Sequence, residues 1–441
     1  MRRLLLCSLM AGLAHLALGG EGGIEVGEEF FLLADGPGKG IQATPDVAFG
    51  DGVYLAVWRE GWHGKGGRAR IFAARVSTEG KVLEPKGIEI APCNDGVQEH
   101  PRAAFGGGLF LVVWQDLRNG RDYDVFAARV SKEGKVLDSE PVAVAAAPRT
   151  QALPAVASDG GGWRPAPGPK AEPSASGPPR AAGFLVAWQG LVGEETAYRG
   201  FAAPVGADGK VGAAIETRAT PQPKLAWGGS CYLAAYGSQT VSTVMLSPEG
   251  KPLNATQWGN QTIRSTKAAA FSISAAGGNG WLVVGHRSPP DPWGWGGPGA
   301  MRAAFVNPDG TLENQDAVKE PAGVKDRLPG WLDFGREKKP GAAWPWGQSA
   351  SVWAGSHSLV VWQRHHLGGE KMTNFENCDL IAARVDGFKS LDAAGVPIAA
   401  SDAEETRPAL ASDGAGHLLC VYEKSIPGSG SQITGRMLTA P

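Results

Sequence analysis

The sequence predicts an all-β protein, a seven-bladed β-propeller built from four-stranded antiparallel blades. Two observations lead to this fold class. First, a short apolar strand that ends in an aromatic residue, followed by a strand with a pair of alanines, recurs along the chain. The period of about 50 residues is typical of propeller blades. Second, the last repeat lacks its fourth strand, and the N-terminal region carries a surplus one.

The best-formed repeat lies between residues 101 and 144. Turn residues separate four short apolar runs there: 102–105, 109–114, 124–130 and 136–144. None of these runs has helical spacing, and four strands joined by tight turns form an up-and-down antiparallel sheet. The second run is apolar on both faces, as expected of a strand that neighbouring blades cover on both sides. Gly134 supplies the left-handed conformation that the hairpin turn after the third strand needs.

Seven repeats align on the last residue of their second strand: Trp58, Trp114, Trp188, Tyr236, Gly285, Trp362 and Tyr422. We expect the recurring aromatic residue to pack between blades. Four third strands share an arginine: Arg75, Arg129, Arg384 and Arg436. We expect this arginine to form a structural ion pair with an acid such as Asp116.

The chain is predicted to close into a ring. The last repeat stops after its third strand, and residues 29–34 resemble a fourth strand. Pairing the two removes two sheet edges at once. We therefore expect one propeller over residues 24–441, with these blades: 43–91, 98–146, 150–216, 219–263, 266–318, 348–399, and 404–441 completed by 24–36.

Residues 1–20 have the pattern of a secretory signal peptide. Arg2 and Arg3 precede an apolar run over residues 4–18, and a small-x-small cleavage site follows at residues 17–19. We therefore expect an exported protein, periplasmic, cell-surface or extracellular. No other apolar run is long enough to span a membrane. The net charge of −2 argues against nucleic acid as a partner.

The cysteines leave three pairings open after the predicted cleavage. Cys93, Cys231, Cys378 and Cys420 remain. A disulfide between Cys378 and Cys420 would join adjacent blades. Neither CxxC nor a Cys/His spacing typical of metal sites is present, so we expect no metal and no cofactor.

The repeat resembles that of secreted bacterial β-propeller proteins. The resemblance rests on residues 111–120, which include Trp114, Asp116 and Arg118, and on residues 124–130. It covers nearly the whole mature chain, closely in blades 1, 2 and 6 and less closely in blades 4 and 5. The resemblance implies the fold and export. It carries over no catalytic residue, because the shared positions are those that pack the blades.

Loops that break the repeat are the candidate binding surface, because loops carry function in such folds. The insertions of blades 5 and 6 and the loops of blades 1 and 2 open on one face, whereas the Pro-rich segment 161–182 lies on the other. Exposed Trp beside Arg and His suits a carbohydrate, since aromatic rings stack on sugars and charged groups bind hydroxyls or carboxylates. The ligand-binding candidates are Trp62, His63, Arg118, Arg287, Trp293, Trp295, Trp331, Trp344 and Trp346.

Catalytic candidates are few. His365 or His366 could act as a base, with Arg364 or Arg287 neutralising a carboxylate, as a polysaccharide lyase requires; His286 is a further catalytic candidate. The catalytic motifs of phosphate-binding loops, serine hydrolases, zinc proteases and sialidases are missing. We therefore expect a non-catalytic binding or scaffold propeller whose ligand is a glycan or a protein. The alternative is a carbohydrate-active enzyme, a lyase or hydrolase acting on an acidic glycan.

Overall fold

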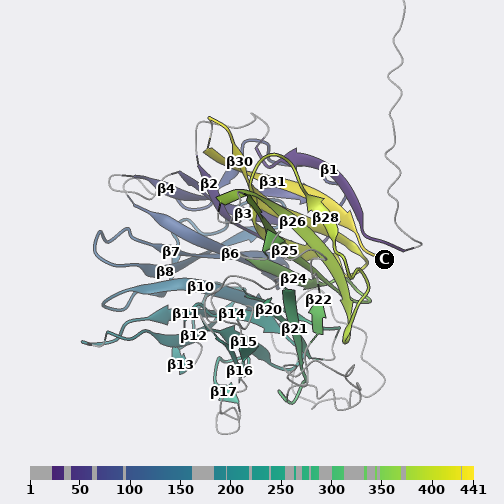
Figure 1. Cartoon of the computed structure of the whole chain (residues 1–441). Coiled ribbons are helices and arrows are strands. Elements are labelled where there is room, and N and C mark those ends of the chain that lie inside the picture. Colours follow the sequence, from purple (N-terminus) through teal and green to yellow (C-terminus); the bar gives the residue numbers. More distant parts are fainter. Residues whose placement is uncertain are drawn as a thin grey trace, which may run out of the picture.

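The computed structural model describes residues 22–33, 41–61, 67–92, 96–160, 183–194, 196–217, 221–237, 240–253, 263–264, 271–277, 280–287, 300–311, 332–334, 343–344, 348–368, 374–428 and 430–441. Strands of this part form seven antiparallel sheets arranged as the blades of a propeller (Figure 1). The described residues contain no helix, and hence none that is long and apolar enough to cross a membrane. The predicted fold class is confirmed.

Blades 1 to 3 have the strand order of an up-and-down meander. Blade 1 consists of β2 (Gln42–Gly50), β3 (Val53–Gly61), β4 (Ala69–Ser77) and β5 (Ile88–Glu89). Blade 2 consists of β6 (Gln98–Gly106), β7 (Leu109–Asp116), β8 (Asp124–Ser131) and β9 (Val142–Ala145). Blade 3 consists of β10 (Gln151–Ser158), β11 (Gly183–Gly190), β12 (Arg199–Gly206) and β13 (Ile215–Thr217).

Blades 4 to 6 keep this order, and blades 4 and 6 carry extra short strands. Blade 4 consists of β14 (Lys224–Trp227), β15 (Tyr232–Tyr236), β16 (Thr240–Leu246) and β17 (Pro252–Leu253), with β18 (Ile263–Arg264) paired to β16. Blade 5 consists of β19 (Phe271–Ala275), β20 (Trp281–Arg287), β21 (Ala300–Val306) and β22 (Leu332–Phe334). Blade 6 consists of β23 (Ala343–Trp344), β24 (Ser349–Trp353), β25 (Ser358–Gly368), β26 (Asn374–Asp386), β27 (Lys389–Ser390) and β28 (Val396–Ala399).

Blade 7 is completed by the N-terminal strand, as the sequence predicts. It consists of β29 (Glu405–Ser412), β30 (His417–Ile426), β31 (Gly430–Thr439) and β1 (Glu25–Phe31), and β1 pairs antiparallel with β31. Leu32, just after β1, is fully buried. Glu29 of β1 accepts a hydrogen bond from the Tyr422 hydroxyl (2.6 Å) and lies 2.7 Å from the Lys424 ammonium. Side chains therefore fasten the closing strand in addition to the backbone ladder.

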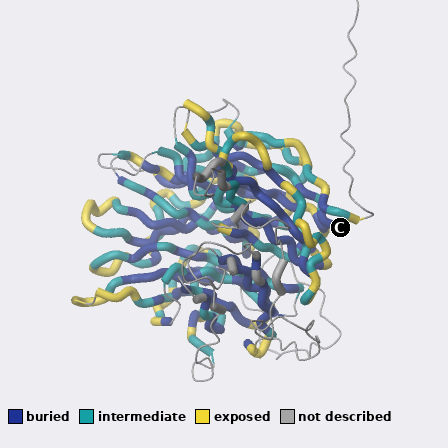
Figure 2. The backbone as a smooth tube through the Cα atoms, in the orientation of Figure 1, coloured by how far each residue is buried: buried dark blue, intermediate teal, exposed yellow. Residues whose placement is uncertain are grey.

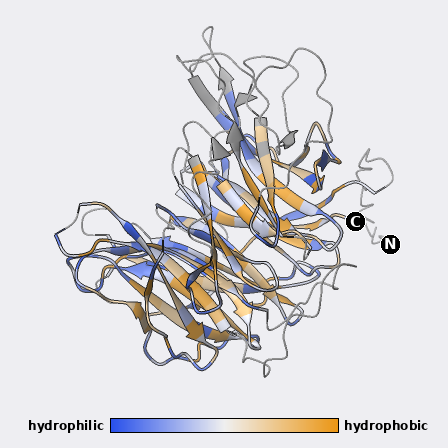
Figure 3. Cartoon of the chain, turned by 90° about the horizontal axis from the view of Figure 1, so that it is seen from below, coloured by the Kyte–Doolittle hydropathy of each residue, from blue (hydrophilic) through white to orange (hydrophobic). Residues whose placement is uncertain are grey.

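The core lies between the blades. Figure 2 shows the strand centres buried and the turns exposed, and Figure 3 shows apolar strands flanked by hydrophilic loops. The aromatic residues that end the second strands of blades 1, 2, 3 and 6 are at most 2% exposed, so their predicted packing role is confirmed. Their indole nitrogens still donate hydrogen bonds, for example from Trp114 to Asp116 (2.9 Å) and from Trp188 to Gln151 (2.8 Å). Burial of such indoles is expected to require these acceptors.

Three of the four recurring arginines pair with an acid in the hairpin that follows them, whereas Arg436 lies 3.5 Å from Glu29 of the closing strand. The expectation that this arginine pairs with Asp116 is wrong. Arg129 lies 2.6 Å from Asp138 and donates to the carbonyl oxygen of Ala207 in the next blade. Arg75 and Arg384 repeat this arrangement with Glu84 and Asp392. The partner is an acid that approaches the arginine across the hairpin, whereas Asp116 accepts from the Trp114 indole and from Arg118.

Replacing Arg129 with alanine is expected to lower the free energy of unfolding by about 2 kcal/mol, because it leaves a largely buried carboxylate unpaired and removes a bond between blades. Equilibrium denaturation by urea measures this loss. Arg199→Ala, which breaks the exposed pair with Glu216, is the control and should cost less than about 0.5 kcal/mol. Equal effects of the two substitutions would contradict the bridging role of Arg129.

Two further expectations need correction. Cys378 and Cys420 are free and buried, as is Cys231, so no disulfide joins blades 6 and 7; Cys93 lies outside the described residues. The fourth strand of blade 5 is β22, which lies past the expected end of that blade at residue 318. Residues 312–331 separate it from the third strand. This separation is longer than that between the third and fourth strands of blades 1 to 4 and 6, so the spacing of the repeat does not predict β22.

Candidate functional site: the central cavity and its mouth

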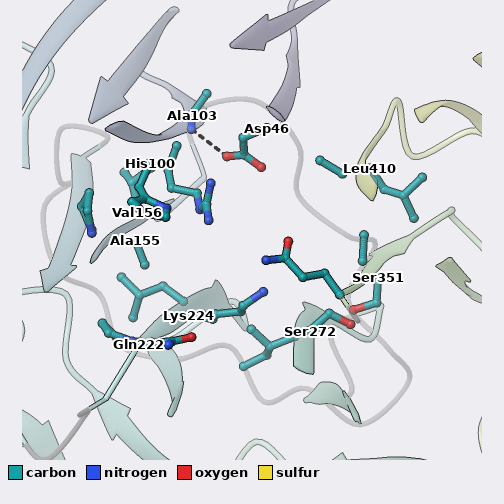
Figure 4. A pocket seen from close by; sticks show the side chains of 18 of the residues that line it. Asp46, His100, Ala103, Ala155, Val156, Gln222, Lys224, Ser272, Ser351 and Leu410 are labelled. Carbon is teal, nitrogen blue, oxygen red and sulfur yellow. Dashed lines mark hydrogen bonds between the residues drawn. The ribbon is translucent and has the colours of Figure 1, made fainter. Parts of the chain in front are cut away.

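The first strand of every blade lines a central cavity of about 550 Å³. These seven inner strands are β2, β6, β10, β14, β19, β24 and β29. Each contacts the inner strand of the next blade, and β29 contacts β2, so the ring around the cavity is closed. Figure 4 shows the side chains that converge on this cavity.

A proline shapes the start of five inner strands. The residue before each proline has a left-handed backbone with φ between 51° and 55°: Thr44, His100, Leu153, Gln222 and Arg407. Such a conformation is strained for residues other than glycine. A side chain of the preceding blade supports it, as when Glu423 accepts from the Thr44 amide (2.6 Å) and Gln115 accepts from the Leu153 amide (2.9 Å). The start of the inner strands, called the mouth below, is therefore held rigidly by contacts between blades.

The backbone pairing between the inner strand and the second strand identifies one equivalent position on every inner strand. This position lies opposite the second-strand residue that comes just before the recurring aromatic position. The seven residues at this position are Asp46, Arg102, Ala155, Lys224, Ser272, Ala350 and Ala409. All seven line the cavity. The ring of equivalent positions thus holds two cations, one carboxylate, one hydroxyl and three methyl groups.

The two cations of this ring have no carboxylate within ion-pair distance among the described residues. Arg102 donates to the carbonyl oxygen of Pro101 (2.7 Å), and the Lys224 ammonium lies 5.6 Å from the centre of the Phe271 ring. Burial, and after it the charge of Arg102, lowers the pKa of Lys224 to about 8, and the charge of Asp46, beyond ion-pair distance, acts against this shift. Asp46 accepts a hydrogen bond from the Ala103 amide (2.9 Å; Figure 4). The cavity wall therefore carries more positive than negative charge near blades 2 and 4.

A second group of charged residues, called the mouth cluster, surrounds the entrance beside blades 7, 1 and 2. Its members are Arg59, Glu99, His100, Tyr123, Arg407 and Glu423. The Tyr123 hydroxyl donates to Glu99 (2.7 Å), and Arg407 donates to Glu423 (3.2 Å). Burial, and after it the carboxylate of Glu99, raises the pKa of Tyr123, so its proton stays on the phenol. Arginines and carboxylates alternate here and largely balance, unlike the cations inside the cavity.

His100 is the member of the mouth cluster that also lines the cavity. Burial, and after it the charge of Arg102, lowers the pKa of His100 to about 4; Arg407 and Arg59 act in the same direction and Glu99 against it. The imidazole is therefore neutral at pH 7. It adds a hydrogen-bonding group to the cavity wall without adding charge.

The low pKa of His100 makes stability depend on pH. Between about pH 4 and 6.5, a histidine in the unfolded chain binds a proton that the folded protein does not, so the free energy of unfolding rises with pH across this window. The lowering of the pKa from 6.5 to about 4 corresponds to a rise of about 3 kcal/mol from this residue. Urea denaturation at several pH values measures it, and His100→Asn should flatten the profile. An unchanged slope in His100→Asn would contradict a buried, neutral His100.

The catalytic candidates of blade 6 lie on the hairpin of β25 and β26. The His366 imidazole lies 2.6 Å from Asp379, and Arg364 lies 3.2 Å from the same carboxylate. His365 is the strand partner of Trp344 on β23. These residues form a group of their own, outside the lining of the central cavity.

The remaining sequence candidates are only partly placed. Arg118 turns back onto its own blade: it lies 2.6 Å from Asp116 and 4.1 Å from the centre of the Phe126 ring. His286 and Arg287 end β20, and Trp344 ends β23; the structure describes their backbone. The other candidates lie outside the described residues: Trp62, His63, Trp293, Trp295, Trp331 and Trp346.

The residues that line the cavity are missed when functional residues are sought only in the loops of the predicted fold. A signal for them exists: the residue after the repeated proline is alanine in blades 3 and 7, and it is charged at Asp46, Arg102 and Lys224. Where some repeats have alanine and others have a charged residue at the same position, packing of the blades does not require the charge, so the charged residues are candidates for a function.

Comparisons with known proteins give folds only. The chain matches no protein-family model and no curated protein. Among solved structures, it is similar to a protein of unknown function from Dyadobacter fermentans (12% identity, TM-score 0.44, covering 95% of this chain and 100% of that one). It is also similar to Trypanosoma rangeli sialidase (6% identity, TM-score 0.44, covering 90% of this chain and 55% of that one). A third similar structure is the parainfluenza virus 5 hemagglutinin-neuraminidase ectodomain (9% identity, TM-score 0.43, covering 95% of this chain and 85% of that one). None of these likenesses says what this chain binds.

Proposed function

We propose that this protein is an exported, non-catalytic propeller that binds a carboxylate-bearing ligand, such as an acidic sugar, in its central cavity. The observation that carries the proposal is the pair of cations, Arg102 and Lys224, that line the cavity without an ion-pair partner among the described residues. Charge inside a protein is costly when it is unpaired. A bound anion would supply the missing partner, and an arginine can hold a carboxylate through two hydrogen bonds.

The size of the cavity supports a small ligand. Its volume of about 550 Å³ falls within the range of about 300–1,000 Å³ that is usual for small-molecule sites. The mouth carries Glu99 and Glu423 as well as arginines, so a ligand with many negative charges would meet repulsion there. A ligand with a single carboxylate is compatible with both the positively charged cavity wall and the glutamates of the mouth.

We further propose that residues 1–20 direct export and that one propeller spans residues 24–441, as in the secreted bacterial propellers that the repeat resembles. A glycan ligand agrees with such a location. The loops of blades 5, 6, 1 and 2 that the sequence analysis identifies remain the candidates for contacts with a longer glycan.

A second candidate function is supported by the pair of His366 and Asp379, which are 2.6 Å apart. A histidine held by a carboxylate can act as a general base, and Arg364 beside it could neutralise an acid group. This pair would serve a lyase or hydrolase acting on an acidic glycan.

Calorimetric titration tests the proposal with D-glucuronate, D-galacturonate and N-acetylneuraminate, each compared with its uncharged methyl ester. We expect at least one acid to bind, and its ester to bind at least tenfold more weakly. Equal binding of acid and ester, or no binding of any acid, would overturn the proposal. Chromatography of acidic oligosaccharides incubated with the protein detects products, whose loss in His366→Gln would favour the enzyme.

A further inference from the structure

We infer that the ligand is a single hydroxylated acid of sugar size, and that its carboxylate lies over Ala155, between Arg102 and Lys224. This inference rests on the proposed function and specifies the ligand and its orientation. It uses the order of the blades, the sizes of the side chains at equivalent positions and the other polar groups that line the cavity.

The two cations flank one small residue. The inner strands of blades 2, 3 and 4 are neighbours, because β6 contacts β10 and β10 contacts β14. Arg102, Ala155 and Lys224 occupy equivalent positions on them. The methyl group of Ala155 leaves space between two long cationic side chains, and a planar carboxylate needs such a space. Figure 4 shows Lys224 pointing into the cavity from the wall that also carries Ala155.

No other small position of the ring offers the same surroundings among the described residues. Ala350 lies between Ser272 of blade 5 and Ala409 of blade 7, which are uncharged. Ala409 neighbours Asp46 of blade 1, whose carboxylate would repel an anion. Electrostatic attraction therefore selects the position over Ala155.

The rest of the cavity offers partners for hydroxyl groups. The carboxamides of Gln222 and Gln348 line it and have no hydrogen-bond partner among the described residues. The hydroxyl oxygens of Ser272 and Ser349 lie 3.3 Å apart on blades 5 and 6. A carboxamide both donates and accepts hydrogen bonds, as a sugar hydroxyl does. Gln222 is half-buried and Gln348 is exposed, so solvent reaches both carboxamides. A ligand with hydroxyls replaces that water by direct hydrogen bonds, which an apolar acid cannot form.

The repeat symmetry supplies a matched pair of variants for the test. Ala155 and Ala409 are equally buried, at 7% exposure each. Ala155→Asp places a carboxylate between the two cations, so we expect the protein to lose at least tenfold in affinity for D-glucuronate and to melt at a higher temperature. Ala409→Asp adds the same charge beside Asp46, and we expect it to melt at a lower temperature than wild type.

Two further measurements keep the outcomes distinct. Ala155→Val fills the space without adding charge and should also weaken D-glucuronate binding at least tenfold, whereas Ala409→Val should change it less than threefold. Cyclohexanecarboxylate, an acid of similar size without hydroxyls, should bind wild type at least tenfold more weakly than D-glucuronate. If both Ala155 variants bind like wild type, or cyclohexanecarboxylate binds as well as the sugar acid, the inference fails while the proposed function stands. If wild type binds no acid, both fail.

Discussion

A protein in which Arg102 and Lys224 are both replaced by methionine is expected to lose at least a hundredfold in affinity for the acidic ligand. A hydrogen bond to a charged group contributes about 1.5–3 kcal/mol when its loss leaves a partner unpaired. Two such contacts account for about 3 kcal/mol or more, which corresponds to about two powers of ten in the dissociation constant. Calorimetric titration with D-glucuronate measures the loss.

The same double substitution is expected to stabilise the protein when no ligand is present. Methionine fills a similar volume without charge. Arg102 and Lys224 are half-buried in the cavity wall, and replacing them by apolar side chains is expected to stabilise the folded protein by about 1 kcal/mol. The pKa of Lys224, lowered to about 8, gives this effect a pH dependence. Between about pH 8 and 10.5 the unfolded chain binds a proton at this lysine that the folded protein does not, so wild-type stability gains from Lys224 as pH rises. The variant should lack that gain.

Arg70→Met is the control for the double substitution, because Arg70 pairs with Glu89 at the exposed edge of blade 1. It should change neither affinity nor melting temperature appreciably. If the double variant lost affinity and also melted at a lower temperature than wild type, the account would be contradicted. Such a result would mean that the two cations stabilise the ring of blades and are not reserved for binding a ligand.

Removing the N-terminal closing strand is expected to have the largest effect on stability. A chain that begins at Ile41 lacks β1, so β31 becomes an exposed edge and Tyr422 and Lys424 lose Glu29. The core also loses the fully buried Leu32. We expect the melting temperature to fall by at least about 10 °C and the protein to associate through the open edge. Thermal unfolding and size-exclusion chromatography measure the two effects.

A synthetic peptide of residues 22–34 provides the control for this truncation. Because the strand makes its contacts without a tight turn to β31, it should bind in trans and restore much of the melting temperature. A truncated chain that melts within 2 °C of the full chain would show that the ring does not depend on this closure.

The fold follows from local patterns, and the sequence therefore predicts it. Six of the seven blades carry an aromatic residue at the position of Trp114, and the surplus N-terminal strand identifies the closure. The predictions failed where an ion-pair partner or a strand lies at an unexpected separation along the sequence. Arg129 pairs with Asp138 across a hairpin rather than with Asp116, and the long insertion in blade 5 displaces its fourth strand.

The cavity was harder to predict for a physical reason. Asp46, Arg102 and Lys224 are far apart in sequence and meet only because the ring closes. Each follows a proline that reads as a turn signal, and only the strand register shows that the three occupy equivalent positions facing one cavity. The tryptophans in the predicted loops directed the site prediction away from the cavity, and most of these candidates lie outside the described residues.

A crystal structure of the protein with D-glucuronate tests the central claim most directly. We predict electron density for one sugar acid in the central cavity, with its carboxylate over Ala155 and its oxygens within hydrogen-bonding distance of Arg102 and Lys224. A ligand bound instead at the tryptophan-bearing loops or beside His366, with the cavity filled by water alone, would contradict the account.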